Sequence, residues 1–424
     1  MKPEIKQRIE QIKAGQVPEG YKRTKIGVVP KEWEEVRFKK MFSRLSRKNC
    51  ENNDNVLTIS AQYGLISQSE FFNKNIASED KSNYFLLHKG EYAYNKSYSN
   101  GYPYGALKKL ERYEKGIVSP LYICFSPTSD NKCAEYYSHY FESNLIGKEI
   151  KAIAQEGARN HGLLNISVND FFNMYILNPP LAEQEKIVKI LSVQDRIIEL
   201  YQRKIEELQK MKKVYLSKMF PKKGENVPEW RFPQFTDPWE QRKLGDVAKY
   251  RNGKAHENDI SEQGKFIVVN SKFVSTNGEV RKFSNKQIEP LFKNEIAFVL
   301  SDVPNGRAIA RTFLVDKNDK YTLNQRIAGI TPIEGVCPYF LHILMNRNNY
   351  FLQFDDGAKQ TNLSVTDVME FAEYYPSSEE QQQIGVLFQQ LDNLITLHQR
   401  KLEETKKYKK ALMQLLLTGI VRCE

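Results

Sequence analysis

The sequence predicts an α+β protein with two domains in tandem, each followed by a long helix. The chain has 424 residues, which is too long for one ordinary domain and fits two or three. One stretch with a helix-like tail occurs twice along the chain. We therefore expect a first domain at residues 1–180, a first helix at 181–221, a second domain at 222–376 and a second helix at 377–424.

The repeat is the strongest feature of the sequence. Asn165–Phe220 aligns without gaps with Asn362–Leu417, at an offset of 197 residues (362 − 165), and this offset pairs Asp195 with Asp392. The stretches between, roughly 44–156 and 249–356, show no clear similarity, so we expect two analogous halves with variable middles. The matching segments are "NISVNDF" (165–171) with "NLSVTDV" (362–368), "QRKIEELQKMKK" (202–213) with "QRKLEETKKYKK" (399–410), "GARN" at 157 with "GAKQ" at 357, "VPEGYK" (17–22) with "VPEWRF" (227–232), and "EWEEVRFKKMF" (32–42) with "PWEQRKLGDVA" (238–248).

The tails of the repeat have the composition of long helices. From Leu181 to Phe220 there is no glycine or proline, and prolines at 179, 180 and 221 flank the segment. The second tail starts after Pro376, with Ser377 or Ser378 as N-cap, and stops at Gly419.

Apolar residues recur every seven positions along both tails, which predicts a seam buried against another helix. The simplest partner for each tail is the other tail, and the alternative is that each tail packs only on its own domain. Lysines beside the seam, such as Lys212, are interpreted as solvated, so their replacement is expected to be mild. The predicted coiled-coil interface consists of Leu191, Ile198, Tyr201, Ile205, Leu208, Phe388, Ile395, Leu402 and Leu412.

Composition narrows the class of protein. The net charge of +11 favours an anionic partner such as nucleic acid, although a merely basic cytosolic protein would show it too. The five cysteines form no CxxC pair and the six histidines show no paired ligand spacing, so we expect no disulfide scaffold and no bound metal. The N-terminus lacks the apolar core of a signal peptide, and no apolar run approaches a membrane span, which predicts a cytoplasmic location.

Enzyme motifs are missing, so no catalytic residue is predicted. "NPPL" (178–181) is similar to the Asn-Pro-Pro-aromatic motif of DNA adenine methyltransferases, in which the aromatic residue stacks on the flipped base, but here the fourth residue is Leu181. No glycine-rich cofactor loop follows a strand, and a Pro-Pro stop before a helix explains the segment better. Gly264-Lys265 is followed by Phe266, which leaves ATP binding unsupported. "TDPWEQRK" (236–243) loosely resembles a metal nuclease, but its twin shares only Trp-Glu, which we interpret as a core tryptophan.

Several polar loops have the residue types that contact DNA. Asn and Gln can pair with adenine, Arg and Lys with guanine, and Ser, Tyr and backbone amides with phosphates. The loops lie in "YNKSYSNGYPYG" (94–105), "SDVPNGRAIAR" (301–311), "LNQRIAG" (323–329) and "VVNSKFVSTNGEVRKF" (268–283), the last interpreted as two strands around a "TNGE" turn. The alternative for each is an ordinary polar hairpin. The predicted DNA-binding residues are Lys96, Tyr98, Asn100, Tyr102, Asn270, Lys272, Asn277, Arg281, Asn305, Arg307, Arg311, Gln325 and Arg326.

The duplicated plan, with "LNPPLAEQEKIVKILSVQDRIIELYQRKIEELQKMKKVYLSKMF" (177–220) and its second copy, resembles the specificity subunit of type I restriction-modification systems. The resemblance covers essentially the whole chain. It implies two target recognition domains related by a pseudo-twofold axis, and two helices that form an antiparallel coiled coil. Each domain would read one part of a split DNA sequence.

The resemblance also implies partners. Two methyltransferase subunits would bind the helices and nearby surfaces, and restriction (translocase and nuclease) subunits would join them. This chain would hold no cofactor, because S-adenosylmethionine, ATP and Mg²⁺ would be bound by the partner subunits. We therefore expect a non-catalytic subunit that recognises double-stranded DNA. The alternative is a self-contained DNA modification enzyme whose catalytic motifs have diverged.

Overall fold

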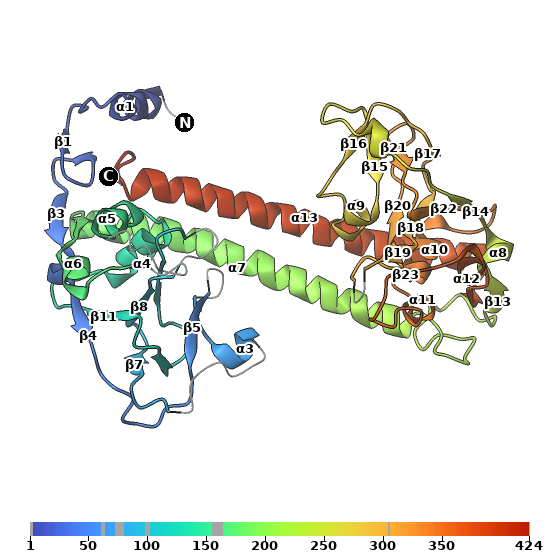
Figure 1. Ribbon diagram of the computed structural model, residues 1–424, viewed down its shortest axis with the longest axis horizontal. Coiled ribbons are helices and arrows are strands. Elements are labelled where there is room, and N and C mark those ends of the chain that lie inside the picture. Colours follow the sequence, from blue (N-terminus) through green and yellow to red (C-terminus); the bar gives the residue numbers. More distant parts are fainter. Residues whose placement is uncertain are drawn as a thin grey trace. The chain divides into compact units, whose positions relative to one another are not determined.

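The computed structural model describes residues 3–60, 64–72, 80–97, 102–154, 164–303 and 306–423. The chain divides into two compact units. The first unit contains Met1–Tyr201 and Lys401–Glu424, and the second contains Gln202–Arg400. Two long helices, α7 (Leu181–Lys218) and α13 (Ser378–Leu416), each contribute one part to each unit (Figure 1).

The domain of the first unit is built around a four-stranded antiparallel sheet with the order β4-β11-β8-β9. Two-stranded pairs, β12-β3, β1-β2, β10-β7 and β5-β6, surround it. The elements are α1 (Pro3–Lys13), β1 (Tyr21–Arg23), β2 (Val28–Pro30), β3 (Glu34–Arg37), α2 (Phe38–Met41), β4 (Phe42–Leu45), β5 (Leu57–Ser60), β6 (Gly64–Ser67), α3 (Gln68–Phe72), β7 (Phe85–His88), β8 (Tyr92–Asn95), β9 (Ala106–Lys109), β10 (Lys115–Val118), β11 (Ile123–Pro127), α4 (Ala134–Glu142), α5 (Gly147–Ile153), α6 (Val168–Asn173) and β12 (Tyr175–Asn178).

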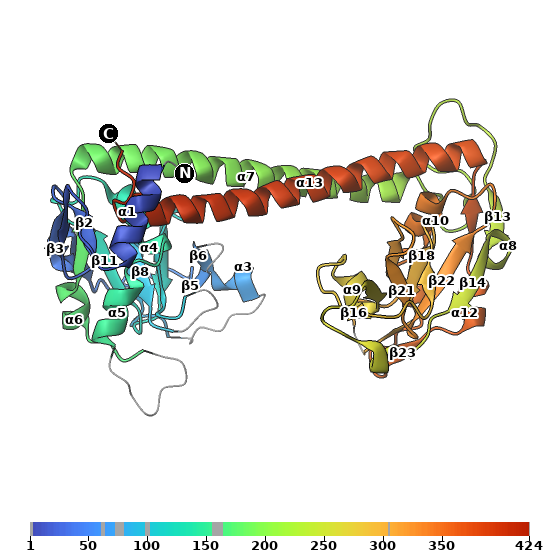
Figure 2. The same ribbon diagram turned by 90° about the horizontal axis from the view of Figure 1, so that it is seen from above.

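Aromatic side chains fill the core of the first unit. Phe38 and Phe42 stack with ring centroids 4.7 Å apart, and Phe125 meets both rings edge-on. Trp33 is fully buried, as the sequence predicted for the tryptophan that opens each domain. The core continues through α4 to the long helices, so α4 lies between the sheet and the helix segments (Figure 2).

The domain of the second unit has a four-stranded antiparallel sheet with the order β14-β22-β18-β20. A second sheet, β16-β15-β21-β17, and the pairs β13-β24 and β19-β23 complete it. The elements are β13 (Glu240–Lys243), α8 (Leu244–Val247), β14 (Ala248–Asn252), η1 (Glu257–Asp259), β15 (Phe266–Val269), α9 (Ser271–Ser275), β16 (Phe283–Ser284), β17 (Pro290–Leu291), β18 (Ile296–Val299), β19 (Ser301–Asp302), β20 (Thr312–Leu314), β21 (Tyr321–Leu323), β22 (Ile327–Pro332), α10 (Pro338–Met345), α11 (Asn349–Leu352), β23 (Thr361–Asn362), α12 (Val365–Met369) and β24 (Ala372–Tyr375).

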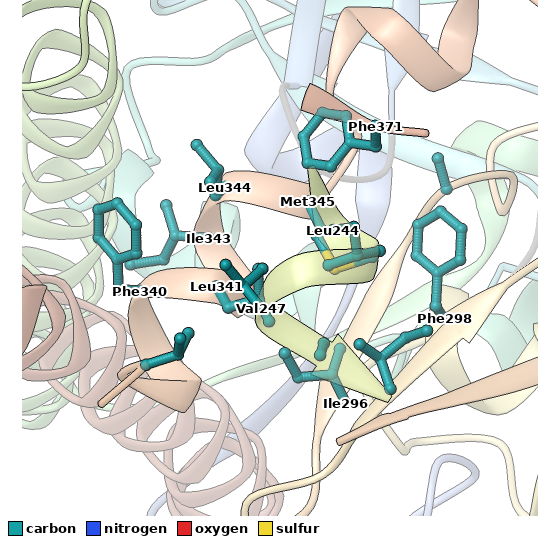
Figure 3. Packing of buried hydrophobic residues seen from close by; sticks show 14 of the residues in the cluster. Leu244, Val247, Ile296, Phe298, Phe340, Leu341, Ile343, Leu344, Met345 and Phe371 are labelled. Atoms are coloured by element: carbon teal, nitrogen blue, oxygen red, sulfur yellow. The ribbon is translucent and has the colours of Figure 1, made fainter. Parts of the chain in front are cut away.

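The core of the second unit forms where α10 packs on the sheet. Figure 3 shows Leu341 and Met345 of α10 facing Leu244 and Val247 of α8. On its other side, Phe340 stacks on Phe220 just beyond the end of α7, with ring centroids 5.7 Å apart. The helix α10 therefore joins the domain to the long helices in this unit, as α4 does in the first unit.

The two domains share one scaffold although their middles differ in sequence. In both, a strand pairs with the strand just before the long helix, and a four-residue helix leads into the central sheet. The central sheets then have the same order, because β4, β11, β8 and β9 correspond to β14, β22, β18 and β20. The dissimilar middles of the sequence are therefore two versions of one fold.

The repeated "S-V-x-D" segments are helix starts. Ser364 caps α12 by accepting a bond from the N–H of Asp367, whose carboxylate accepts one from the N–H of Ser364. In the first unit, Ser167 caps α6 through the N–H of Asp170 in the same way. The repetition thus preserves a local structural signal, since Ser and Asp at this spacing form a capping box.

One sequence interpretation is wrong. The segment 268–283 was predicted to be two strands around the "TNGE" turn, but residues Ser271–Ser275 form the helix α9. Asn270 supplies the reason, because its side chain accepts a bond from the N–H of Phe273 and caps that helix. β15 and β16 do pair antiparallel, but α9 and the turn both lie between them.

The long helices pair antiparallel within each unit, as the fold prediction stated. In the first unit, Ile187 and Leu191 of α7 share a core with Met413 and Leu416 of α13. In the second unit, Leu208, Phe388, Leu391 and Ile395 belong to one core. The alternative, in which each helix packs only on its own domain, is therefore wrong.

The predicted seam residues are buried to different degrees. Ile198, Tyr201 and Leu412 are partly buried, and the other six predicted residues are buried. Across the part of the chain that the structure describes, no helix is both long enough and apolar enough to cross a membrane.

Candidate nucleic-acid interface

The candidate interface of the second unit lies at one end of its central sheet, where β18 ends and β20 begins. The N–H of Leu300 donates to the carbonyl of Arg326 at 3.1 Å, and the N–H of Leu363 donates to the carbonyl of Leu300 at 2.9 Å. The side chain of Gln360 reaches the hydroxyl of Ser301 at 2.9 Å. Three loops that are far apart in sequence therefore meet at this end.

The helix α9 joins the same end of the sheet. The hydroxyl of Ser271 donates to the carbonyl of Ser301 at 3.4 Å, and the N–H of Asn324 donates to the carbonyl of Val269 at 3.1 Å. The structure thus brings together most of the predicted DNA-binding residues of the second half, which the sequence placed in three separate segments. Asn305 lies outside the described residues.

Several predicted residues have structural contacts of their own. Arg281 donates to the carbonyl of Gly278 at 2.7 Å, and Gln325 donates to Glu257 at 2.9 Å. Asn277 adopts a left-handed backbone conformation (φ 49°) in the turn after α9. Lys272 lies within α9, while Arg307 and Arg326 are exposed. Whether any of them contacts DNA stays a prediction.

The first unit has the equivalent loop between β8 and β9. The N–H of Leu164 donates to the carbonyl of Lys96 at 3.1 Å, which corresponds to the pairing of β19 with β23 in the second unit. Tyr102 lies in this loop, with the ammonium of Lys108 5.3 Å from its ring centroid. Tyr98 and Asn100 lie outside the described residues.

A buried ion pair joins the two long helices in the first unit. The ammonium of Lys409 on α13 lies 2.5 Å from the carboxylate of Asp195 on α7 and 2.7 Å from that of Glu142 on α4. His139 lies 3.8 Å from each carboxylate. Burial alone would raise the pKa of Glu142, but the hydrogen bond with His139 and the charge of Lys409 lower it to about 2.

The same carboxylates and histidine form a group that could hold a metal ion. The ammonium of Lys409 already lies within hydrogen-bond distance of both carboxylates, and its side chain is only 6% exposed. A lysine in this position supplies the positive charge that an ion would otherwise bring. We therefore interpret the group as a structural ion pair.

The second unit contains the repeat-related pair. Lys212 on α7 donates to both carboxylate oxygens of Asp392 on α13, at 2.6 and 2.8 Å, and the hydroxyl of Tyr339 donates to the same carboxylate at 2.8 Å. The offset of 197 relates Lys212 to Lys409 (212 + 197) and Asp195 to Asp392 (195 + 197). The interpretation of Lys212 as a solvated lysine is therefore wrong, because each copy of the repeat supplies one lysine and one aspartate to these pairs.

Each long helix also starts on a buried glutamate. Glu183 at the start of α7 accepts two bonds from Arg422 and one from the indole N–H of Trp33. Glu380 at the start of α13 accepts two bonds from Arg231, at 2.7 and 2.8 Å. Sequence reasoning missed these pairs, although the repeat aligns the two glutamates (183 + 197), which was the available signal.

The "NPPL" segment is a helix start in the structure. Gln184 donates to the carbonyl of Pro179 at 2.8 Å and to the side chain of Asn178 at 3.0 Å, which also accepts from Tyr137. An open cavity of about 390 Å³ lies beside it, and its lining contains no aromatic residue like the one that ends the methyltransferase motif. The lining residues are Glu32, Glu34, Asp130, Lys132, Asn178, Pro179, Pro180, Leu181 and Gln184.

Known proteins share this arrangement. The family model of the type I restriction modification DNA specificity domain matches residues 30–210 and 236–407. A chain named as the MjaX type I restriction enzyme specificity subunit of Methanocaldococcus jannaschii is 24% identical over 95% of this chain and 97% of its own length. The MjaVIII specificity subunit of the same organism is 26% identical over 74% of this chain and 73% of its own.

Solved structures show the same fold. The type I restriction-modification system S subunit from M. genitalium matches with a TM-score of 0.54 and 16% identity, over 92% of this chain and 96% of its own length. A chain from a study of complex assembly in the type I R-M system matches with a TM-score of 0.53 and 15% identity, over 93% of this chain and 99% of its own. These matches confirm the two-domain fold predicted from the repeat. The chain therefore belongs to the family of type I restriction-modification DNA specificity proteins, whose members are non-catalytic specificity subunits.

Proposed function

We propose that this chain recognises a bipartite DNA target, with each domain reading one half-site. The observation that carries the proposal is the shared scaffold with different loops at the same end of the central sheet. A fixed sheet presents loops in a constant orientation, while changed side chains in those loops change the bases that they contact. Two such domains with unlike loops are suited to two unlike half-sites.

We also propose that the chain scaffolds two methyltransferase subunits, each docked on one exposed apolar stripe. On α7 in the first unit, the stripe contains Ile190, Val193 and Leu200, which are 38%, 51% and 46% exposed. On α13 in the second unit, it contains Val386 and Leu394, which are 49% and 43% exposed. Each set falls on one helical face, and exposed apolar faces of this kind mark binding surfaces for partner helices.

The repeat supports two equal partners. The offset of 197 aligns Ile190 with Leu387, Ile197 with Leu394, and Leu200 with Leu397, whereas Val193 aligns with Gln390 and Val386 with Lys189. The two helices therefore share part of one apolar pattern, which two equal partners could both contact. Restriction subunits would join this assembly, and S-adenosylmethionine, ATP and Mg²⁺ would be bound by the partner subunits. We place the complex in the cytoplasm, where its substrate would be the chromosomal DNA.

Docking on the stripes can be tested by counting bound subunits. Leu200→Glu should leave one methyltransferase subunit per chain, and Leu200→Glu with Leu394→Glu should leave none, as measured by native mass spectrometry of the co-purified complex. Lys210→Glu, at an exposed position outside the stripe, is the control. Two bound subunits in the double variant would refute the docking surface.

Bipartite recognition is tested by replacing residues 222–376 with the corresponding part of a relative. Sequencing of methylated DNA from a host that carries the chimaera and the methyltransferase should show a change in one half-site only. A change in both half-sites would contradict modular recognition. Methyl transfer by the purified chain alone, with labelled S-adenosylmethionine, would instead establish the alternative of a self-contained modification enzyme.

A further inference from the structure

Three arginines meet where the loop between β18 and β20 contacts the turn after α10. The Nε of Arg311 donates to the carbonyl of Arg307 at 2.6 Å. The backbone N–H of Arg347 donates to the carbonyl of Ala310 at 2.8 Å, and its Nη1 donates to the carbonyl of Ile309 at 3.3 Å. Two of the three guanidinium groups are thus anchored on the backbone of one loop.

The backbone of this site is held in an unusual conformation. Ala310 (φ 57°) and Arg347 (φ 56°) both adopt left-handed conformations, which are unfavourable for residues other than glycine. A further bond, from the N–H of Thr312 to the side chain of Asn346 at 3.2 Å, ties the two segments together. Their mutual positions are therefore fixed by several contacts and not by the arginine side chains alone.

The positive charge of this cluster is not neutralised. Among the residues that the structure describes, no ion pair involves Arg307, Arg311 or Arg347. The nearby carboxylate of Asp302 accepts bonds from the backbone N–H groups of Ala308 and Ile309 instead, at 2.5 and 3.1 Å.

Like charges within the cluster repel one another at Arg311. Burial lowers the pKa of Arg311, and the positive charges of Arg347 and Arg307 lower it further. A bound anion would relieve both effects. Because Arg311 is half-buried while Arg307 is exposed, the cluster stays open to a ligand from solvent.

We propose that Arg307, Arg311 and Arg347 bind a phosphate of the DNA backbone beside the second half-site. This rests on the proposed DNA-recognition function, since the cluster lies at the loop end of the sheet. A phosphate suits the site better than a base edge, because Arg311 and Arg347 each use one N–H on a carbonyl while their charge remains available. Such a contact fixes the position of the duplex against the domain.

The test measures binding of the methyltransferase-loaded complex to a duplex that carries its methylated target, at several salt concentrations. Arg311→Ala with Arg347→Ala should reduce the salt slope, log K against log[salt], by about 0.9, because one phosphate is no longer neutralised, which is roughly a 5-fold loss of affinity at 0.15 M salt. The loss should be equal for a random-sequence duplex. Arg311→Lys with Arg347→Lys should keep most of the slope, because a lysine can replace a phosphate contact.

Arg242→Ala is the charge-matched control, because β13 lies at the other end of the domain. The strand β13 continues through α8 to Ala248, which pairs with Pro332 at the last residue of β22. The arginine cluster instead lies near Arg326, which precedes the first residue of β22. Arg307→Ala gives an independent measurement if the double variant unfolds, and should reduce the slope by up to about 0.9, the value for one phosphate.

An unchanged slope in the double variant, or in Arg307→Ala if the double variant is unfolded, would overturn the phosphate site. An unchanged slope with an altered methylation motif would also overturn it and indicate base contact. If the wild-type complex does not prefer a bipartite target, the proposed function is overturned. The phosphate site is tested separately, because its salt slope can be measured with the random-sequence duplex alone.

Discussion

The repeat-related ion pairs should contribute unequally to the free energy of unfolding. Comparison of two single variants, Lys409→Met and Lys212→Met, measures the difference. Lys409 is 6% exposed and neutralises two carboxylates, whereas Lys212 is 27% exposed and neutralises one. Breaking a buried pair costs about 3–5 kcal/mol and a surface pair about 0–1 kcal/mol. Because Asp195 and Glu142 are themselves 38% and 39% exposed, we expect a loss of about 2–3 kcal/mol for Lys409→Met.

Lys212→Met should cost less, about 1 kcal/mol, because Asp392 is 30% exposed and keeps the hydroxyl of Tyr339 as a donor. The assay is urea denaturation, with hydrogen exchange used to assign the loss to α4 in one variant and to α10 in the other. Lys410→Met, at the exposed neighbouring position, is the matched control and should be neutral.

The pH dependence gives a second, independent measurement of the Lys409 pair. The folded-state pKa of Glu142 is lowered from 4.5 to about 2, so the stability that it contributes is present above about pH 4.5. That stability is lost as the pH falls toward 2. The wild type and Lys409→Met should therefore differ at pH 7 and converge below about pH 2. An equal difference at both values, or equal losses in the two lysine variants, would refute the reasoning.

Three further predictions concern the helices. Arg231→Ala leaves the fully buried carboxylate of Glu380 without its two charged bonds and should cost about 3 kcal/mol in urea denaturation, where a loss below 1 kcal/mol would contradict us. Ser364→Ala removes the cap of α12 and should cost about 1 kcal/mol, and Ser364→Asp should restore it. Insertion of one heptad into each long helix, near Glu206 and Glu403, adds about 10 Å of helix. It should lengthen the DNA spacer between the two half-sites of the methylated target by roughly 3 base pairs. An active variant with the original spacer would show that the helices do not set it.

The duplication and the long helices could be predicted from the sequence by itself. Local signals suffice for them, because a gapless repeat, a glycine-free segment and prolines at its ends act over a few residues. The apolar seam was predicted from a signal of the same kind, since apolar residues recur at heptad spacing within each tail. Leu191 of the first tail and Phe388 of the second tail are both fully buried. The core tryptophans at the start of each domain were predicted equally well.

Only the tertiary structure showed which polar residues are paired. Lys212 stands among other lysines on a charged helix, and nothing in its neighbours along the chain distinguishes it from a solvated one. Its partner, Asp392, lies 180 residues away, so the contact exists only once α7 and α13 pair. The buried pair of Glu380 with Arg231 was missed for the same reason.

The candidate DNA-binding residues were also predicted only in part from the sequence. Their residue types suggested DNA contact, but their convergence depends on strand order, because Arg326 and Leu300 meet only when β22 lies beside β18. The local hairpin signal at "TNGE" was overridden by the cap that Asn270 provides for α9. Arg307 and Arg311 of the arginine cluster were among the predicted residues, but Arg347 was not, since it joins them through a turn 36 residues beyond Arg311 along the chain (347 − 311). Sequence periodicity therefore determined the elements, while long-range packing decided which side chains share one site.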